Sequence, residues 1–294
     1  MYKVIIWGMG KWYNQYFNLI KYQESKEKII ICGIVSNDNG LKKIDSYPFI
    51  EKKNLKYLEF DYCIVAMNNY EEAVKESIFL GINRECMIPI RVFSIPYFDF
   101  EEYIEIKNSK ISIISRNCWG GICYHYFGLK FNSPFINLFF LDTEFNKLLS
   151  DFDNYMSLPL IYEKDVYGER EGKSYPVGRL GDIRIFFNHY ASFDEAKRCW
   201  ERRKDRINYN NLLVVSTTSC KDVAEEFDKL PYDNKIIFVP FNTALESSVS
   251  IFDKNDNDFF TFGMKANSTG NGENGVIDLI QLLSKGRIRE RIEI

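Results

Sequence analysis

Short apolar runs alternate with helix-like stretches along the first part of the chain, and this alternation constrains the fold more than any other feature. The apolar runs lie at residues 3–7, 29–35, 62–67 and 86–90. Asn69, with Glu72 three residues later, predicts a helix start, and Gly81 predicts its end. Strands that alternate with helices predict a parallel sheet with helices on both faces.

The rhythm breaks near residues 100–110, where Pro96, clustered aromatic residues and an acidic stretch precede a new start. We therefore predict two domains, 1–106 and 107–294. In the second, apolar runs lie at 111–115, 135–141, 182–188, 212–216 and 235–239. Residues 159–181 contain Gly168, Gly172, Pro176 and Gly178 and are predicted to be a loop. The expected fold class is α/β: two three-layer α/β/α domains with mainly parallel sheets, the first Rossmann-like.

Composition and charge exclude several classes of protein. Hydrophobic residues make up 46% of the 294 residues and the formal charge is −3, so a nucleic-acid partner is not expected. The longest clean apolar run, 29–35, is far shorter than the roughly 18 residues of a membrane span. The chain begins MYKVIIWGMG, without the pattern of a secretory signal, and its seven cysteines include no CxxC pair. A cytoplasmic protein without a metal centre is expected.

The first apolar run leads into a glycine turn of the kind that approaches a phosphate. Gly8 and Gly10 fit the start of a dinucleotide-binding fingerprint, but Tyr13 stands where its third glycine belongs. Asp38 is the candidate for the acidic residue after the second strand. These residues disfavour NAD and leave open a nucleotide, a nucleotide sugar, or a tight turn with no ligand.

Polar residues follow several predicted strands of the second domain. Ligands of open α/β sheets bind outside the carboxyl ends of the strands, so these residues are the candidate site. They are Ser115, Arg116, Asn117 and Cys118 after the first strand, Asp142 after 135–141, His189 after 182–188, Thr217 and Thr218 after 212–216, and Asn242 after 235–239.

One interpretation of this edge is thiol catalysis. Cys118 stands at the entry to a predicted helix, whose positive end favours the thiolate, and His189 would be the base. Asp142 is the carboxylate at the same edge. The other histidine, His125, lies within the helix predicted over 119–128, where packing or surface exposure explains it. Because cysteines are often simply buried, a structural role for Cys118 is the alternative.

The other interpretation is an anion cradle at Ser115–Gly121. Asn117, Gly120 and Gly121 would let backbone N–H groups face a phosphate, and Arg116 would add positive charge. Such a cradle suits a donor substrate such as a nucleotide sugar, with Thr217 and Asn242 as further binding residues.

Several short motifs of the second domain resemble one bacterial family, domain-of-unknown-function family 1919 (DUF1919), over about residues 110–245. The motifs are SRNCWGG at 115–121, NSPF at 132–135, YPVG at 175–178, HY at 189–190, WERR at 200–203 and RIN at 206–208. Members of this family are often labelled exopolysaccharide biosynthesis proteins. Residues 3–90 resemble the small Rossmann-like N-terminal domains of sugar-modifying and capsule-related enzymes. The pair Asn117-Cys118, with Ser133-Pro134-Phe135, is also loosely similar to a papain-like cysteine peptidase family.

These resemblances imply a protein of exopolysaccharide or capsule biosynthesis, a transferase acting on a sugar or acyl donor, with a small-molecule or glycan substrate. Two alternatives stay open: a thiol hydrolase or acyltransferase that uses Cys118 and His189, and a non-catalytic ligand-binding or scaffold protein.

Overall fold

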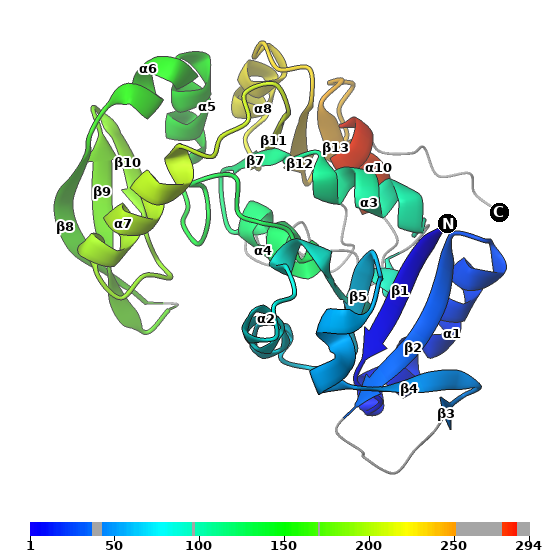
Figure 1. The fold of residues 1–294 in the computed structure, drawn as a ribbon. Coiled ribbons are helices and arrows are strands. Elements are labelled where there is room, and N and C mark those ends of the chain that lie inside the picture. The colour runs from blue at the N-terminus through cyan, green and yellow to red at the C-terminus, as the bar shows by residue number, and fades with distance from the viewer. Residues whose placement is uncertain (37–42, 96–97, 170, 251–277, 287–294) are drawn as a thin grey trace. The chain divides into compact units, whose positions relative to one another are not determined.

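The computed structural model describes residues 1–36, 43–95, 98–169, 171–250 and 278–286. The chain forms two compact units (Figure 1). The first comprises residues 1–105 and 126–128, and the second comprises residues 106–125 and 129–294.

The first unit contains a six-stranded sheet in the order β3-β4-β2-β1-β5-β6, in which every neighbouring pair is parallel except β3 with β4. Its strands are β1 (Tyr2–Trp7), β2 (Ile29–Ser36), β3 (Lys43–Ile44), β4 (Tyr47–Glu51), β5 (Tyr62–Val65) and β6 (Met87–Pro89). The helices are α1 (Lys11–Ser25), α2 (Tyr70–Phe79) and α3 (Phe100–Asn108), the last of which ends beyond the unit boundary. The four apolar runs read from the sequence are thus strands, and the edge pair β3-β4 was not predicted.

Alternation along β1 divides the first unit's interior between the two faces of the sheet. Ile5 and Trp7 pack in one cluster with Ala73 and Val74 of α2. Val4 and Ile6 point to the opposite face, and α1 packs against β2 without joining the α2 cluster. The predicted cap of α2 is confirmed, since Asn69 Oδ1 accepts a hydrogen bond from the backbone N–H of Glu72 at 3.3 Å.

The second unit contains a four-stranded parallel sheet in the order β13-β12-β11-β7. Its strands are β7 (Ser112–Ser115), β11 (Leu212–Thr217), β12 (Lys235–Val239) and β13 (Ser248–Ser250). The surrounding helices are α4 (Trp119–Phe127), α5 (Asp142–Ser150), α6 (Phe152–Ser157), α7 (Phe193–Lys204), α8 (Lys221–Asp228) and α10 (Leu279–Lys285). The predicted α/β class is confirmed.

A separate antiparallel sheet, in the order β10-β9-β8, corrects the loop predicted over 159–181. Its strands are β8 (Leu160–Gly168), β9 (Lys173–Leu180) and β10 (Ile183–Phe186), shown in green in Figure 1. Most side chains of β8 are exposed or half-buried, so the strand lacks an apolar run. Gly172 and Gly181 adopt positive φ at the two turns, where glycine avoids steric strain.

The segment 135–141 is buried without forming a strand, which corrects its use as a strand in the sequence argument. Phe139 makes an isolated antiparallel bridge to Phe186, with hydrogen bonds of 2.9 and 3.0 Å. Asn137 has φ of 61°, which interrupts extended backbone. The helix predicted over 144–156 is likewise divided into α5 and α6 at Asp151, whose φ and ψ are −143° and 52°.

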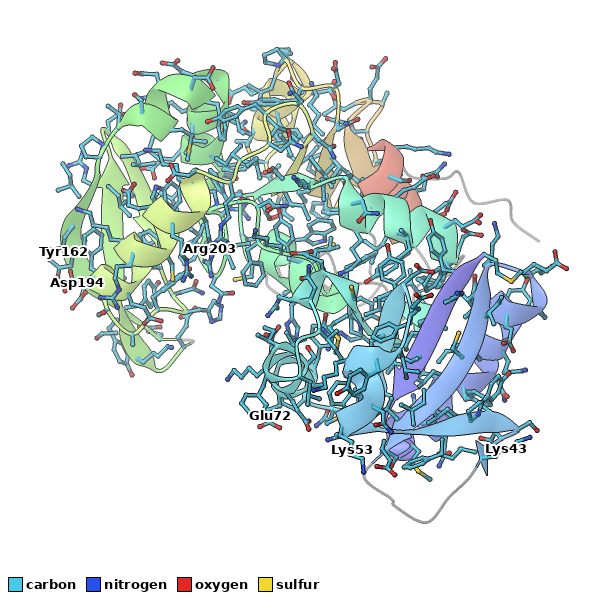
Figure 2. The ribbon with its side chains drawn as sticks, in the orientation of Figure 1. Lys43, Lys53, Glu72, Tyr162, Asp194 and Arg203 are labelled. Atoms are coloured by element: carbon cyan, nitrogen blue, oxygen red, sulfur yellow. The ribbon has the colours of Figure 1, made fainter. Side chains whose placement is uncertain are left out.

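Aromatic side chains fill the core of the second unit. Phe135 is fully buried and its ring lies 5.5 Å from that of Phe140 and 5.4 Å from that of Trp200. Arg203 of α7, labelled in Figure 2, is 7% exposed and lies over the ring of Phe131. Its guanidinium also donates a hydrogen bond to Tyr190 Oη at 2.8 Å, so this cation packs within the second unit. Among the described residues, no helix combines the length and the apolar character needed to cross a bilayer.

Candidate functional site

Six polar residues meet at the carboxyl ends of β7 and β11, and we call them the carboxyl-edge cluster: Ser115, Arg116, Asn117, Asp142, Thr217 and Thr218. The guanidinium of Arg116 donates hydrogen bonds to Thr217 Oγ1 at 2.7 Å and to the carbonyl of Phe140 at 3.1 Å. Asn117 Nδ2 donates to Thr217 Oγ1 at 3.4 Å, and Thr218 Oγ1 donates to Asp142 Oδ2 at 2.7 Å.

The register of the parallel strands produces this meeting. Ser115 pairs with Val215 across β7 and β11, so the residues that follow each strand lie side by side. The ladder extends past the strand ends, because the backbone N–H of Arg116 donates to Val215 and that of Thr218 donates to Phe238. The prediction that these two strand ends share one edge is confirmed. Asp142 reaches them from the first turn of α5, and not from a strand end.

Arg116 is the only cation of the carboxyl-edge cluster, and its side chain is half-buried. Burial lowers the pKa of Arg116 to about 10, while the nearby carboxylate of Asp142 opposes that shift. The guanidinium therefore carries its charge at neutral pH. The hydroxyls of Ser115, the last residue of β7, and Ser216 of β11 are buried without a hydrogen-bond partner among the described residues.

Helix α4 begins directly beside Arg116. Asn117 Oδ1 accepts from the backbone N–H of Trp119 at 3.0 Å, which caps the helix start. Gly120 lies so close to β7 that an added Cβ would stand 3.0 Å from Ser115 Cβ, and one on Gly121 would stand 3.3 Å from Ile136 Cγ2. Both glycines are buried, so tight packing of α4 on the sheet accounts for them, and their predicted role in phosphate binding stays a prediction.

Cys118 and His189 belong to different sheets of the second unit. Cys118 follows β7, is half-buried, and its Sγ lies 4.0 Å from the carbonyl of Leu138. His189 follows β10 of the antiparallel sheet and is exposed. Partial burial is the main cause that lowers the pKa of His189, Lys173 lowers it further, and Glu171 opposes the shift. The expectation that five strand ends share one edge is therefore wrong for His189, and a Cys118–His189 dyad stays a prediction.

The remaining residues of the predicted edge lie outside the carboxyl-edge cluster. Asn242 follows β12 and is exposed. His125 is exposed on α4. In the described part of the chain, no group of three His, Cys, Asp or Glu side chains is arranged to hold a metal ion.

The first unit has its own small pocket at the carboxyl ends of β5 and β6. Its volume is about 40 Å³, and its lining includes Trp12, Asn68, Tyr70 and Arg91. Gly10 is the N-cap of α1, and apart from its chain neighbours no atom of the described residues lies within 4 Å of the position where a Cβ would stand.

Gly8 has φ of 107°, and a Cβ there would stand 2.9 Å from the carbonyl oxygen of Ala66. The turn between β1 and α1 therefore requires glycine at this position for packing and conformation alone. Asp38, the predicted acidic partner, lies outside the described residues.

Sequence reasoning missed a larger pocket of about 460 Å³ at the opposite end of the parallel sheet in the second unit. It is lined in part by the segments that lead into β11 and β12, residues 209–212 and 231–234. Both segments contain a tyrosine and an asparagine directly before an apolar strand. This repeated pattern was the sequence signal that could have predicted the pocket. It was not used because ligands of open α/β sheets are expected at the carboxyl ends of the strands, and these residues precede the strands.

Comparisons with known proteins find a similar family model for each part of the sequence. Residues 1–88 match the model "C2185-like, N-terminal", and residues 90–283 match "Domain of unknown function (DUF1919)". An "Uncharacterized protein" of Haemophilus influenzae strain Rd is 37% identical over 138 residues. That match covers 46% of this chain and 64% of the Haemophilus protein, less than two thirds of its length. Because the second model matches more than half of the chain, this protein belongs to the DUF1919 family.

Proposed function

We propose that the chain is a transferase acting on a sugar or acyl donor in exopolysaccharide or capsule biosynthesis, and that the carboxyl-edge cluster holds the donor. The observation that carries the proposal is Arg116, a half-buried cation that hydrogen-bonds to Thr217 at the carboxyl edge of a parallel sheet and is charged at neutral pH. Nucleotide sugars and acyl-coenzyme A both carry a diphosphate. Arginine recognises such phosphates with paired N–H donors.

The position of α4 supports the same ligand class. The helix starts three residues after Arg116, and the N-terminal end of a helix favours an anion. Asn117 is half-buried between that helix start and Thr217, so a ligand at the edge would contact its amide.

Asp142 supplies a base for the transfer. Its carboxylate, held by the Thr218 hydroxyl, would accept the proton of an acceptor hydroxyl. The acceptor oxygen then bonds to the reacting carbon of the donor, and the bond from that carbon to the leaving group breaks. The leaving group keeps the electron pair. From a nucleotide sugar it is the nucleoside diphosphate, whose negative charge develops near Arg116, and from acyl-coenzyme A it is the thiolate of the coenzyme.

Thermal-shift measurements with nucleotide sugars, acyl-coenzyme A and dinucleotides test the proposal, because a ligand of the folded state raises the melting temperature. We expect stabilisation by UDP-glucose or acetyl-coenzyme A that is lost in Asn117→Asp, which places a negative charge beside the donor phosphate. Asn210→Asp adds the same charge at an exposed asparagine at the other end of the sheet and should keep it. Absence of stabilisation by every ligand, or equal effects of the two variants, contradicts the proposal.

The dinucleotides in this panel also test the first unit, which we propose to be a Rossmann-like domain. The strand order β2-β1-β5-β6 with α1 after β1 and α2 after β5 supports that assignment. A dinucleotide or nucleotide effect that is unchanged in Asn117→Asp would assign the ligand to the first unit.

Thiol catalysis is the second candidate, and the position of Cys118 favours it. The carbonyl of Cys118 accepts from the backbone N–H of Ile122, so the thiol stands at the first turn of α4. Alkylation mapping should then show Cys118 reacting faster than the exposed Cys220. Slower reaction of Cys118 would contradict thiol catalysis and leave the donor site unaffected. The third candidate, a non-catalytic scaffold or sensor, would bind these ligands without turnover.

A further inference from the structure

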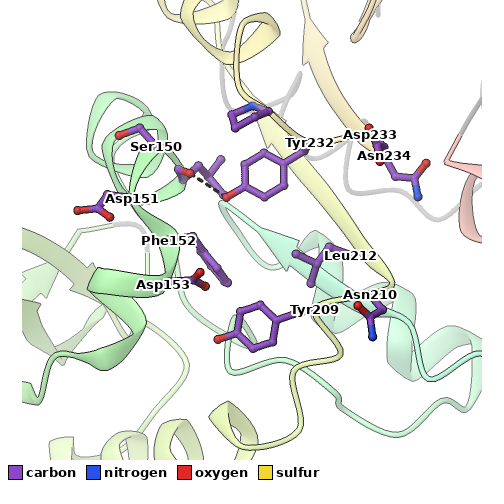
Figure 3. A pocket seen from close by; sticks show the side chains of 12 residues that line it. Ser150, Asp151, Phe152, Asp153, Tyr209, Asn210, Leu212, Tyr232, Asp233 and Asn234 are labelled. Atoms are coloured by element: carbon purple, nitrogen blue, oxygen red, sulfur yellow. Dashed lines mark hydrogen bonds between the residues drawn. The ribbon is translucent and has the colours of Figure 1, made fainter.

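A second site lies at the amino end of the parallel sheet in the second unit. The pocket of about 460 Å³ is lined by twelve residues from three segments: residues 149–153, residues 209, 210 and 212, and residues 231–234. Figure 3 shows the segment between α5 and α6 on one side and the segments that enter β11 and β12 on the other. A strand of six residues spans about 20 Å, so this pocket and the carboxyl-edge cluster are at opposite ends of β11.

Aromatic rings form the floor of the pocket. Tyr209 is 52% exposed, and its ring meets Phe152 edge to face at 6.0 Å. Tyr232 directs its hydroxyl away from the opening, donating to the carbonyl of Leu149 at 2.7 Å (Figure 3). With that hydroxyl engaged, Tyr232 offers mainly its ring to a ligand, whereas the more exposed Tyr209 can offer its ring and its hydroxyl. Exposed ring faces favour C–H groups and cations.

The polar lining is acidic and rich in amides. It includes Asp151, Asp153 and Asp233 with Asn210 and Asn234, and none of the twelve lining residues, all of which the structure describes, is Lys, Arg or His. Burial raises the pKa of both Tyr209 and Tyr232, and the carboxylate of Asp153 raises it further in each case, so Asp153 lies near both rings. A phosphate or carboxylate ligand would be repelled here, and a protonated amine would be attracted.

We propose that this pocket binds an amino sugar, a polyhydroxylated ring with a protonated amine. The apolar face of the sugar would stack on Tyr209, the amine would pair with Asp153, and the amides of Asn210 and Asn234 would hydrogen-bond to hydroxyls. The pocket volume accommodates a ligand of this size. This site is independent of the proposed donor site, because it has the opposite charge and lies at the other end of the sheet.

Calorimetric titration of the full chain with glucosamine, glucose, N-acetylglucosamine and spermidine tests the proposal. We expect glucosamine to bind at least tenfold more tightly than glucose or N-acetylglucosamine, which lack the charge. Asp153→Asn should weaken glucosamine binding about tenfold, and Tyr209→Ala about threefold to tenfold. Tyr167→Ala removes a 66% exposed tyrosine of β8 as the matched control and should leave binding unchanged.

Three results would overturn the proposal. Equal affinity for glucosamine and glucose would show that the carboxylates do not select the ligand. Spermidine binding as tightly as glucosamine would assign the pocket to linear polyamines. No binding by any of the four compounds would show that the pocket is not a site for this chemistry, whatever the fate of the donor site.

Discussion

The two ends of the parallel sheet in the second unit differ in charge, burial and hydrogen bonding. At the carboxyl end, Arg116 is half-buried and donates hydrogen bonds to Thr217 and to the carbonyl of Phe140. At the amino end, Asp151, Asp153 and Asp233 line a pocket, and each is exposed. The same strands therefore present a hydrogen-bonded end that contains a cation and a more exposed end that is acidic.

The two ends differ in hydrogen bonding because their charged groups differ in exposure to water. A guanidinium that is partly removed from water needs hydrogen-bond partners within the fold, so residues at the carboxyl edge serve both stability and any ligand. Exposed carboxylates are hydrated and contribute little to stability. Substitutions at the carboxyl end should therefore cost folding free energy, whereas those at the amino end should affect mainly binding.

The largest expected effect is at Arg116. Arg116→Met should lower the free energy of unfolding by roughly 2–4 kcal/mol, because it removes two hydrogen bonds from a charged group and leaves Thr217 Oγ1 buried with fewer partners. Tyr209→Ala at the amino end should cost less than about 1 kcal/mol. Urea denaturation measures the free energy of unfolding of both variants. An equal decrease in the two variants would show that the two ends of the sheet contribute equally to stability, which contradicts the distinction.

Gly120 separates packing from phosphate binding at the carboxyl end. An added methyl group at Gly120 would crowd Ser115 Cβ and Ile113 Cγ2, at 3.0 and 3.1 Å, so Gly120→Ala should destabilise the chain by about 1–3 kcal/mol without any ligand. The control Gly10→Ala, where the added Cβ meets no atom within 4 Å, should cost less. If Gly120→Ala kept full stability and lost only ligand binding, Gly120 would be required for phosphate binding and not for the packing of α4 on the sheet.

Thr218 tests the link between Asp142 and β11. Thr218→Val keeps the shape but removes the hydroxyl that donates to Asp142 and accepts from the backbone N–H of Cys220, which should cost about 1–2 kcal/mol. Thr143→Val, at an exposed position of α5, is the matched control and should change stability by less than about 0.5 kcal/mol. Thermal denaturation of the pair decides whether Asp142 is anchored as described.

The smallest expected effect on stability comes from the protonation of His189, and it tests whether His189 lies near the carboxyl-edge cluster. Its pKa should lie below the ordinary value of 6.5, so the folded state should lose a little stability as the pH falls through that value, because the unfolded chain then binds the proton more readily. NMR titration should show Lys173→Met raising the pKa of His189 and Asn117→Asp leaving it unchanged. A pKa of His189 that changes in Asn117→Asp and not in Lys173→Met would show that His189 lies near the carboxyl-edge cluster, and this would support thiol catalysis.

Local sequence signals predicted much of this fold because local forces determine those elements. The apolar run at 235–239 coincides with β12, and the Asn69–Glu72 capping signal coincides with the start of α2, where the backbone N–H of Glu72 donates to Asn69 Oδ1. The strand ends at Arg116 and Thr217 were placed together correctly, since adjacent parallel strands align their carboxyl ends.

The errors arose where tertiary packing overrides local preference. β9 contains Pro176 and Gly178, and for this reason it was predicted to be a loop. Gly178 is nevertheless in a strand, and it is a glycine because Leu160, Phe187 and Phe193 leave no room for a side chain there. The run at 135–141 is apolar because the core surrounds it, not because it is a strand. His189 was misplaced because periodicity does not reveal which sheet a strand joins.

The most direct test of opposite ligand preferences at the two ends is an amide chemical-shift map of one isotope-labelled sample, titrated with UDP-glucose and then with glucosamine. UDP-glucose should perturb residues 115–121 and 217–218, and glucosamine should perturb residues 149–153 and 209–212. Perturbation of the same end by both ligands, or of neither end by either, would contradict the account.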